Sequence, residues 1–349
     1  MYTFEKPEIQ EYYSIVYSDK KIFFRSPERF VVIEGNSVEL LKKVMKYLNG
    51  KFTVRGIVSK TKLSEIIVKK ILKLLAEKNL LYKTSPTIYK KGSNLKETSS
   101  FFSRIMNGEK LLDKMESTSL TLINANPLAC HLIISLSHLN LRKIKLVDNQ
   151  LVTPHDIEQS PYGIYTNDDL GAPRIKALKR RLHFKNFTAE VLPQDLQERT
   201  LDKVIRDCNM VILCSEELST TSHNLVDKVC HKLNKPWMNV RLLGDTGEVG
   251  PIVSPFKTPC FTCYENRIKS NSSYENYYYD NLFKDVNEKW GTLREFYSIT
   301  ANYATLEIVK FFSDYFKMSG VSTVISIDFM NNKTETDTVL RVPNCATCG

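Results

Sequence analysis

The chain has 349 residues, of which 42% are hydrophobic and 25% are charged. This balance is typical of a globular protein and excludes a disordered or fibrous chain, while the length predicts two or three domains. No apolar run reaches the roughly 18–20 residues that a membrane helix needs, and the N-terminus lacks the pattern of a signal peptide. We therefore expect a cytoplasmic protein with reduced thiols and no membrane partner.

Charge is concentrated at the N-terminus. The chain carries 49 Lys and Arg against 39 Asp and Glu, a net of +10, and residues 1–85 hold 17 basic and 9 acidic residues, a net of +8. A basic segment of this kind suits an anionic partner, which is either nucleic acid or an acidic peptide. A solvated lysine-rich surface without any partner is the alternative.

Residues 1–85 are predicted to form three strands and then three helices. β-Branched and aromatic residues favour strands at residues 9–17, 21–25 and 29–33. Apolar residues then recur at helical spacing, which predicts helices at residues 37–48, 52–58 and 64–78. This order is that of a winged-helix-turn-helix module of the α+β class.

The rest of the chain is predicted to form an α/β domain. A linker is expected at residues 84–98 and a helix from Ser99 to Met115. Predicted strands at residues 120–123, 144–147, 189–192, 210–214 and 237–240 then alternate with helices at residues 128–139, 172–182 and 224–233. This alternation indicates a parallel, doubly wound, Rossmann-like sheet. Residues 270–318 are expected to be helical, residues 324–329 and 338–342 to close as a strand pair, and the domains to span 1–85, 86–118 and 119–349.

Two Cys-x-x-Cys pairs are the most specific chemical signal in the sequence. Cys260 and Cys263 form the first pair, and Cys345 and Cys348 form the second. Four thiolates suit tetrahedral Zn²⁺ and leave no position open for water, so the pattern predicts a structural zinc site that joins two distant segments. A redox pair or free thiols are the alternatives. The other cysteines are expected to be small core residues: Cys130, Cys208, Cys214 and Cys230.

The first βαβ unit of the α/β domain, which ends at Asp148, has the layout of a nucleotide-binding unit without its glycines. Such a unit needs glycines after its first strand so that the backbone can approach a phosphate at the helix N-terminus. Here these positions are Asn124, Asn126 and Ala129, and Pro127 removes one amide donor. Asp148 stands where a ribose-binding acid would lie. The sequence therefore predicts a degenerate nucleotide site and no bound ATP.

Several motifs resemble those of ubiquitin-activating-enzyme-like proteins. They are Asp148, Asp169-Leu170-Gly171-Ala172-Pro173-Arg174, Gly250-Pro251-Ile252-Val253, Pro259-Cys260-Phe261-Thr262-Cys263 and Arg341-Val342-Pro343-Asn344-Cys345-Ala346-Thr347-Cys348. The module before them resembles the RiPP recognition element, which binds leader peptides of ribosomally synthesised, post-translationally modified peptides. The combination is similar to that of ocin-ThiF-like and cyclodehydratase C-type proteins, which serve azoline-forming YcaO-type enzymes, and to that of microcin-type adenylating enzymes.

Departures from the family's nucleotide site distinguish these two groups. The resemblance implies that adenylating members carry the glycine loop, an arginine after the ribose-binding Asp, a lysine near Gly171 and a later Asp for Mg²⁺. Here the last three positions read Gln159, Arg174 and Glu216. Four changes in one site argue against ATP chemistry in this chain. In the cyclodehydratase systems, the resemblance implies that a separate YcaO-type partner consumes the ATP.

The expected function is that of a non-catalytic scaffold in bacteriocin or thiopeptide-like antibiotic biosynthesis. It would hold the leader of a precursor peptide and dock a YcaO-type cyclodehydratase, which converts Cys, Ser or Thr to thiazoline or oxazoline rings. The leader would add as a strand beside residues 29–33, next to the third helix. The predicted peptide-binding residues are Arg29, Phe30, Val31, Val32, Ile33, Lys69, Ile71 and Lys73.

Two alternative functions stay open. The first is an ATP-dependent, microcin-type peptide adenylating enzyme. The second is a winged-helix DNA-binding regulator, which would use the basic helix that contains Lys69, Lys70, Lys73 and Lys78 and would bind with a steep salt dependence. For the scaffold we expect a homodimer, a complex that can include a flavin dehydrogenase, and no nucleic acid partner.

Overall fold

The computed structural model describes residues 5–82, 101, 108–183, 187–191, 197–217, 220–270, 291–313 and 322–349. The chain divides into two compact units, Met1–Lys114 and Met115–Gly349, which are called unit 1 and unit 2 and are described separately. The linker expected at residues 84–98 lies outside the described residues. In the part of the chain that the structure describes, no helix has both the length and the apolar character needed to cross a bilayer.

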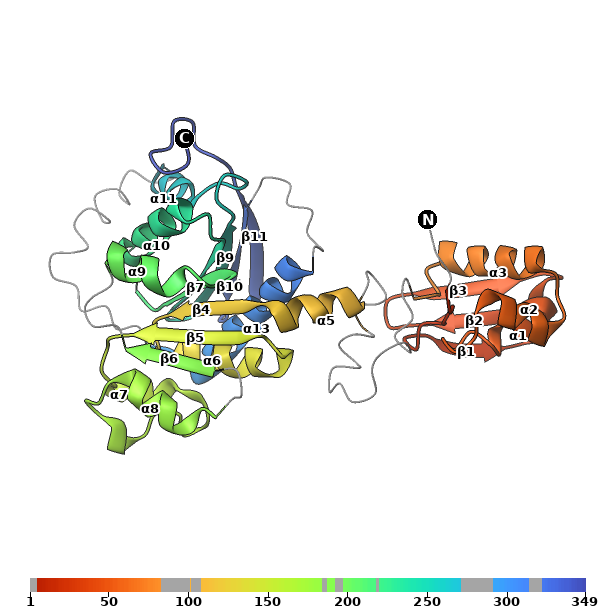
Figure 1. The fold of residues 1–349 in the computed structure, drawn as a ribbon, viewed down its shortest axis with the longest axis horizontal. Coiled ribbons are helices and arrows are strands. Elements are labelled where there is room, and N and C mark those ends of the chain that lie inside the picture. The colour runs from red at the N-terminus through yellow and green to blue at the C-terminus, as the bar shows by residue number, and fades with distance from the viewer. Residues whose placement is uncertain are drawn as a thin grey trace. The chain divides into compact units, whose positions relative to one another are not determined.

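Unit 1 contains a three-stranded antiparallel sheet and three helices (Figure 1). The strands are β1 (Ser14–Tyr17), β2 (Lys21–Arg25) and β3 (Phe30–Glu34), and the helices are α1 (Val38–Met45), α2 (Val54–Thr61) and α3 (Glu65–Glu77). Thr53 and Ser64 cap α2 and α3 by accepting hydrogen bonds from backbone amides. Strands and helices follow one another in the predicted order, and the assignment of unit 1 to the winged-helix class stays a prediction.

One face of the unit 1 sheet is buried against the helices. Ile22 and Phe24 of β2 are fully buried, and Val31 and Ile33 of β3 are no more than 8% exposed. They form one core with apolar residues of α1 and α3, which include Leu41, Val44, Leu72 and Leu75. The first strand is shorter than predicted, because β1 begins at Ser14 and Ile9 forms only an isolated bridge with Leu81.

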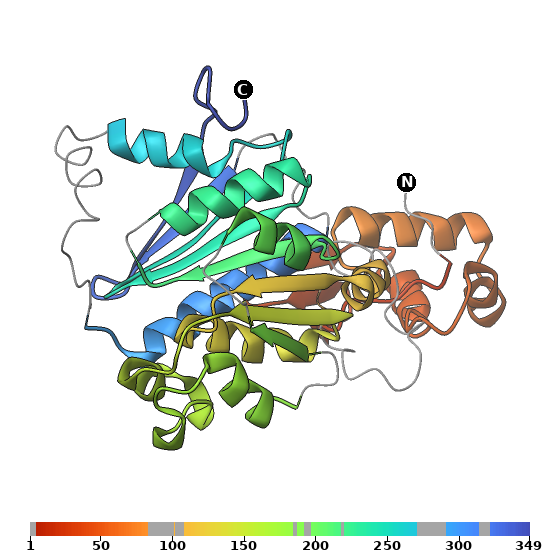
Figure 2. The same ribbon diagram turned by 60° about the vertical axis from the view of Figure 1, so that its left-hand side comes forward.

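Unit 2 is built on an eight-stranded sheet with helices on its faces (Figures 1 and 2). Its strands are β4 (Ser119–Ile123), β5 (Lys143–Asp148), β6 (Phe187–Val191), β7 (Met210–Ser215), β8 (Trp237–Leu243), β9 (Thr246–Val253), β10 (Ser322–Asp328) and β11 (Lys333–Val339). Its helices are α6 (Pro127–Leu136), α7 (Pro154–Gln159), α8 (Arg174–Arg181), α9 (Glu198–Ile205), α10 (Thr221–Lys232), α11 (Phe261–Ser270) and α13 (Arg294–Phe312), and α5 (Gly108–Ser117) leads into β4.

The sheet has the strand order β11-β10-β9-β8-β7-β4-β5-β6. Strands β4 to β8 pair in parallel, as predicted, whereas β9, β10 and β11 pair antiparallel. The prediction of a parallel sheet is therefore correct for only part of it. The closing strand expected at residues 338–342 is wrong, because the strand that pairs with β10 is β11, which ends at Val339.

The parallel strands determine where a site can form. Helix α13 packs against α6, β8 and β9, while α10 packs against α9, β7 and β8. Because β4, β5 and β7 run in the same direction, the loops that follow them meet at one edge of the sheet. These are the loop before α6, the loop before α7 and the segment after Ser215.

Candidate functional site

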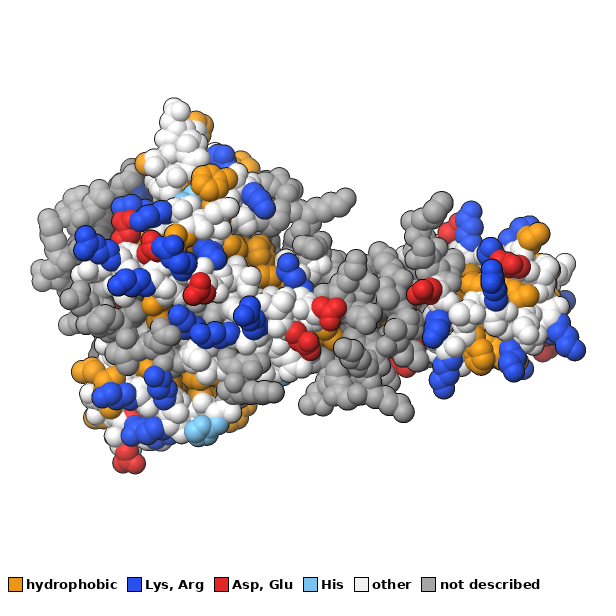
Figure 3. Space-filling model, in the orientation of Figure 1, with side chains coloured by type: hydrophobic (Ala, Val, Ile, Leu, Met, Phe, Trp, Pro, Cys, Tyr) orange, Lys and Arg blue, Asp and Glu red, His pale blue; other side chains and the backbone are white. Residues whose placement is uncertain are grey.

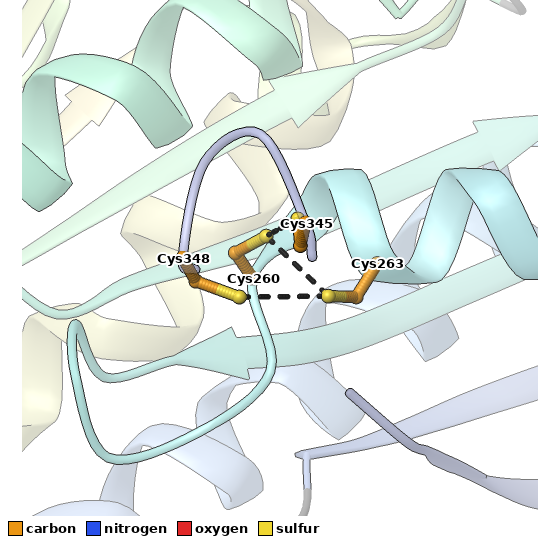
Figure 4. Close-up of side chains that lie close together, drawn as sticks. All are labelled: Cys260, Cys263, Cys345 and Cys348. Carbon is orange, nitrogen blue, oxygen red and sulfur yellow. Dashed lines mark hydrogen bonds between the residues drawn. The ribbon is translucent and has the colours of Figure 1, made fainter. Parts of the chain in front are cut away.

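The two Cys-x-x-Cys pairs lie together in unit 2 (Figure 4). Cys260 immediately precedes α11, Cys263 lies in its first turn, and Cys345 and Cys348 lie in the C-terminal segment after β11. The Sγ atoms are 3.7 Å apart between Cys260 and Cys263, and 3.5 Å apart both between Cys260 and Cys345 and between Cys263 and Cys348. All four sulfurs lie within 4.8 Å of one another.

This arrangement fits a tetrahedral metal ion. A Zn–S bond of about 2.3 Å places the sulfurs of a ZnS₄ tetrahedron roughly 3.8 Å apart, which is close to the separations found here. Cys260 and Cys263 are fully buried and Cys345 is 5% exposed. Burial acts to raise the pKa of Cys345, but hydrogen bonds from the Cys348 and Thr347 amides, together with those from the Cys260 and Cys263 side chains, outweigh it and lower the pKa to about 7. The residues present therefore fit a structural zinc ion held by sulfur alone.

Asp227 of α10 binds the backbone next to the first cysteine pair. Its fully buried carboxylate accepts a hydrogen bond from the indole Nε1 of Trp237 over 2.8 Å and one from the Phe261 amide over 3.1 Å. The Phe261 amide lies between the two cysteines of the first pair, so Asp227 fixes the backbone that presents them. No sequence motif indicated this contact, because 34 residues separate Asp227 from Phe261.

The C-terminal segment is held against α11 by contacts other than sulfur. The hydroxyls of Thr262 and Thr347 are 2.8 Å apart, and the guanidinium of Arg267 donates to the carbonyl of Leu340 over 2.9 Å. The Val342 amide donates to Cys263 Sγ over 3.3 Å. These contacts align the second cysteine pair with the first.

The loop between β4 and α6 carries a side chain at each position predicted for a phosphate-binding glycine. Asn124 has a φ of +71°, a left-handed conformation that favours glycine, yet its side-chain amide donates to the Cys214 carbonyl over 2.8 Å. Asn126 donates to the same carbonyl over 3.2 Å and caps α6 by accepting from the Ala129 amide over 3.0 Å. Pro127 begins α6 without an amide hydrogen. The donors that would meet a phosphate are therefore missing or used within the chain.

Asp148, at the predicted ribose position, is also engaged by the chain itself. Its carboxylate is buried, and one oxygen accepts from the Ala125 amide over 2.9 Å. The other oxygen accepts from the amides of Asn149 and Gln150 over 2.7 and 2.9 Å. A ribose-binding acid must present a free acceptor to the sugar hydroxyls, whereas three of the roughly four acceptor positions of the Asp148 carboxylate already receive backbone donors.

Arg174, at the predicted lysine position, lies between two buried acids. Its guanidinium makes a bidentate contact with Asp156, at 2.9 and 3.0 Å, and lies 3.5 Å from Asp148. Burial acts to lower the pKa of Arg174, but the carboxylates of Asp156 and Asp148 outweigh it and raise that pKa. Asp156 also completes a capping box with Thr153 at the start of α7. The Thr-x-x-Asp pattern is a local signal that could have located Asp156.

Glu216 follows β7 and belongs to a polar cluster with His155 and Tyr297. Nε2 of His155 lies 3.0 Å from Glu216 Oε2 and 2.9 Å from the Tyr297 hydroxyl. The hydrogen bond to Glu216 raises the pKa of His155, and burial raises the pKa of Tyr297. Glu216 also lies 3.5 Å from the Leu128 amide, so it is tied to the same loop. Neither His155 nor Tyr297 was singled out by the sequence analysis.

The other predicted residues fall into two groups. Cys130, Cys208, Cys214 and Cys230 are buried, and burial raises the pKa of each thiol, as expected of core residues. The residues predicted to bind peptide are divided between surface and core. Arg29, Phe30, Lys69 and Lys73 are exposed and Val32 is half-buried, whereas Val31, Ile33 and Ile71 belong to the core of unit 1.

The cysteine cluster leads to a first prediction. The purified chain should contain one zinc ion, and Cys345→Ser should release it and lower the melting temperature by about 10 °C, because structural zinc contributes directly to folding. Elemental analysis and a thermal melt measure both. Cys214→Ala, a buried cysteine outside the cluster, should keep the zinc. A metal-free protein after purification without chelator would contradict the assignment.

A second prediction concerns Asp227. Asp227→Asn replaces one acceptor oxygen by an amide group, so it should accelerate zinc transfer to a chelator by about tenfold. Trp237→Phe removes the indole donor and part of a buried ring but keeps the bond from Asp227 to the Phe261 amide, so it should change the transfer rate much less. The loss of melting temperature in Asp227→Asn should shrink when Cys345→Ser is also present. If the two losses simply add, Asp227 does not act through the cysteine cluster.

This chain resembles one protein family in sequence and several solved structures in fold. The ThiF family model matches residues 101–347. The structure of E. coli MccB with ATP has 17% sequence identity and a TM-score of 0.75, and the alignment covers 98% of this chain and 99% of that one. The microcin C7 biosynthetic enzyme MccB in complex with N-formylated MccA gives 17% and 0.74 with the same coverage.

The heterocyclase TruD has 15% identity and a TM-score of 0.67, over 99% of this chain and 43% of TruD. Among curated proteins no match is found. At these identities the likeness to solved structures shows the fold, an α/β Rossmann-like fold of the E1 type, while the family match covers most of the chain. The chain belongs to the ThiF family.

Proposed function

We propose that this chain is a non-catalytic scaffold in the biosynthesis of a ribosomally made, modified peptide. Unit 1, as a winged-helix recognition element, binds the leader of the precursor. Unit 2 docks a YcaO-type cyclodehydratase, which forms thiazoline or oxazoline rings in the core of the peptide. Holding the leader raises the effective concentration of the core at the partner's active site, and this needs no catalytic group here.

The observation that carries the proposal is that side chains at the nucleotide-site positions bind to other groups of the same chain. Arg174 pairs with both Asp148 and Asp156, and the side chains of Asn124 and Asn126 are bound to the Cys214 carbonyl. A nucleotide at these positions would compete with hydrogen bonds and ion pairs that the chain already makes. These contacts support a chain that does not use ATP itself, and the proposal assigns the chemistry to the partner enzyme.

The register of the unit 1 sheet supports peptide binding at the edge of β3. Among the described residues, β3 pairs only with β2. The Ser26 amide donates to the Arg29 carbonyl, and the Gly35 amide donates to the Lys20 carbonyl. Because hydrogen-bonded and non-hydrogen-bonded residue pairs alternate along an antiparallel pair, these two bonds fix which residues of β3 bond to β2. By this alternation the backbone groups of Val31 and Ile33 face β2, whereas those of Phe30, Val32 and Glu34 face the free edge. An extended peptide can hydrogen-bond to these groups.

The lysines of α3 supply a weaker attraction. Lys69 is 63% exposed and Lys73 is 77% exposed, but each already pairs with an acid on the same helix, Glu65 at 2.7 Å and Glu77 at 3.8 Å. Surface pairs of this kind are worth little, so a peptide carboxylate can compete for either lysine. The larger part of the affinity should come from main-chain hydrogen bonds and apolar contacts.

A second candidate function is that of an ATP-dependent peptide adenylating enzyme. The observation that favours it is the extent of the likeness to MccB, which was solved with ATP and which aligns with 98% of this chain, including most of residues 1–100. The likeness at 17% identity concerns the fold, whereas the difference between the two functions lies in a few side chains. A measurement of ATP binding at the nucleotide-site positions therefore distinguishes the two candidates.

The third prediction is that Mg-ATP does not bind. Titration calorimetry of the full chain should show no saturable heat, because the loop side chains and Arg174 occupy the site. E. coli MccB, measured in the same buffer, serves as the positive control. A micromolar dissociation constant of this chain for Mg-ATP would contradict the scaffold proposal and favour the adenylating enzyme.

The fourth prediction tests β-addition with the cognate leader peptide. Val32→Pro should abolish binding to the full chain in fluorescence anisotropy, because it removes a backbone donor from the free edge. Tyr17→Pro is the matched control, since by the register of β1 its amide faces the opposite edge of the same sheet, and it should bind normally. Lys69→Glu with Lys73→Glu should weaken binding only a few-fold. Normal binding by Val32→Pro would contradict this mode.

A further inference from the structure

The outer face of the unit 1 sheet, opposite the core, is apolar in its middle. The register places Val16 opposite Phe23 and Phe23 opposite Val32, so these side chains form one row across the face. Phe30 lies in the next row, stacks on Phe23 with ring centroids 6.1 Å apart and is 57% exposed. A sheet face that meets water normally carries polar residues. The part of this face that lies on β3, with Val32 in the row and Phe30 beside it, is therefore a candidate contact surface for a peptide at that edge.

The same residues also carry the free backbone groups of β3. The N–H and C=O groups of Phe30 and Val32 face the open edge, as the register shows. A strand paired there would place the residue opposite Val32 on the outer face, against the side chain of Val32. The residues on either side of it would face the core side, next to Val31 and Ile33.

We propose that Phe30 and Val32 form a second apolar contact for the leader peptide, in addition to the contact on the core side. This inference rests on the proposed function, because it takes the occupant of the edge to be the leader. A peptide held on both faces must be apolar at consecutive positions. The leader therefore carries an uninterrupted apolar run rather than an alternating pattern.

The basic charge of residues 1–85 favours acidic residues in the leader on either side of its apolar run. Residues 1–85 have a net charge of +8, from 17 basic and 9 acidic residues, and Figure 3 shows Lys and Arg side chains around hydrophobic ones on the visible face of unit 1. Arg25 lies opposite Phe30 in the register, on the outer face, while Lys21 is paired with Glu34 at 2.8 Å.

In the test, short random peptides are displayed and selected for binding to the full-length chain. Enriched peptides should carry consecutive apolar residues flanked by Asp or Glu. A labelled enriched peptide is then measured by fluorescence anisotropy. Phe30→Thr with Val32→Thr should weaken binding about tenfold, or about 1.4 kcal/mol, because threonine keeps the strand and its hydrogen bonds but removes apolar surface. Val16→Thr is the matched control, since Val16 lies on the same face but two strands away from the edge.

The outcomes separate this inference from the function on which it rests. Enriched peptides with apolar residues only at alternate positions, or a Thr double variant that binds like the wild type, would overturn the second contact. In that case loss of binding in Val32→Pro still supports β-addition. Peptides that bind the Val32→Pro variant normally, or a chain that enriches no peptide, would overturn both. Equal weakening by Val16→Thr would also contradict the proposal.

Discussion

The pairing of Arg174 with Asp148 and Asp156 is the interaction on which the carboxyl edge of the unit 2 sheet depends. A buried carboxylate is costly without a partner, and here one guanidinium serves two of them, at the end of β5 and at the start of α7. Asp148 in turn binds the Ala125 amide, so the same charge network fixes the loop before α6. Removal of Arg174 would leave both acids buried without a counter-charge, although each would keep its hydrogen bonds to the backbone.

This network also bears on what unit 2 can do. In a nucleotide-binding member of such a fold the same edge leaves backbone donors and an acid free for the ligand. Here Asn124, Asn126 and Asp148 make hydrogen bonds within the chain at this edge, and the cysteine cluster brings the start of α11 and the C-terminal segment together. In the proposed function, unit 2 docks the partner enzyme, and the leader binds at the edge of β3, which among the described residues pairs only with β2.

Sequence reasoning succeeded where residue type determines local conformation or coordination. The bounds of β2, the position of α3 and the association of the two cysteine pairs were all predicted. It failed for β9, because Gly250-Pro251 reads as a strand break, and for β11, which is polar and exposed along most of its length and therefore lacks the alternation of a strand with one buried face. The contacts of Asp227 and His155 join residues far apart in the chain, and no local pattern encodes them.

The central claim is that this chain performs no adenylation. Its most direct test is ATP–pyrophosphate exchange by the purified full-length chain in the presence of a peptide that it binds, with E. coli MccB and MccA measured alongside. The account predicts no exchange above that of a protein-free blank, with or without the peptide. Peptide-dependent exchange that Asp148→Asn abolishes would contradict it, because it would show that the carboxyl edge of unit 2 handles ATP.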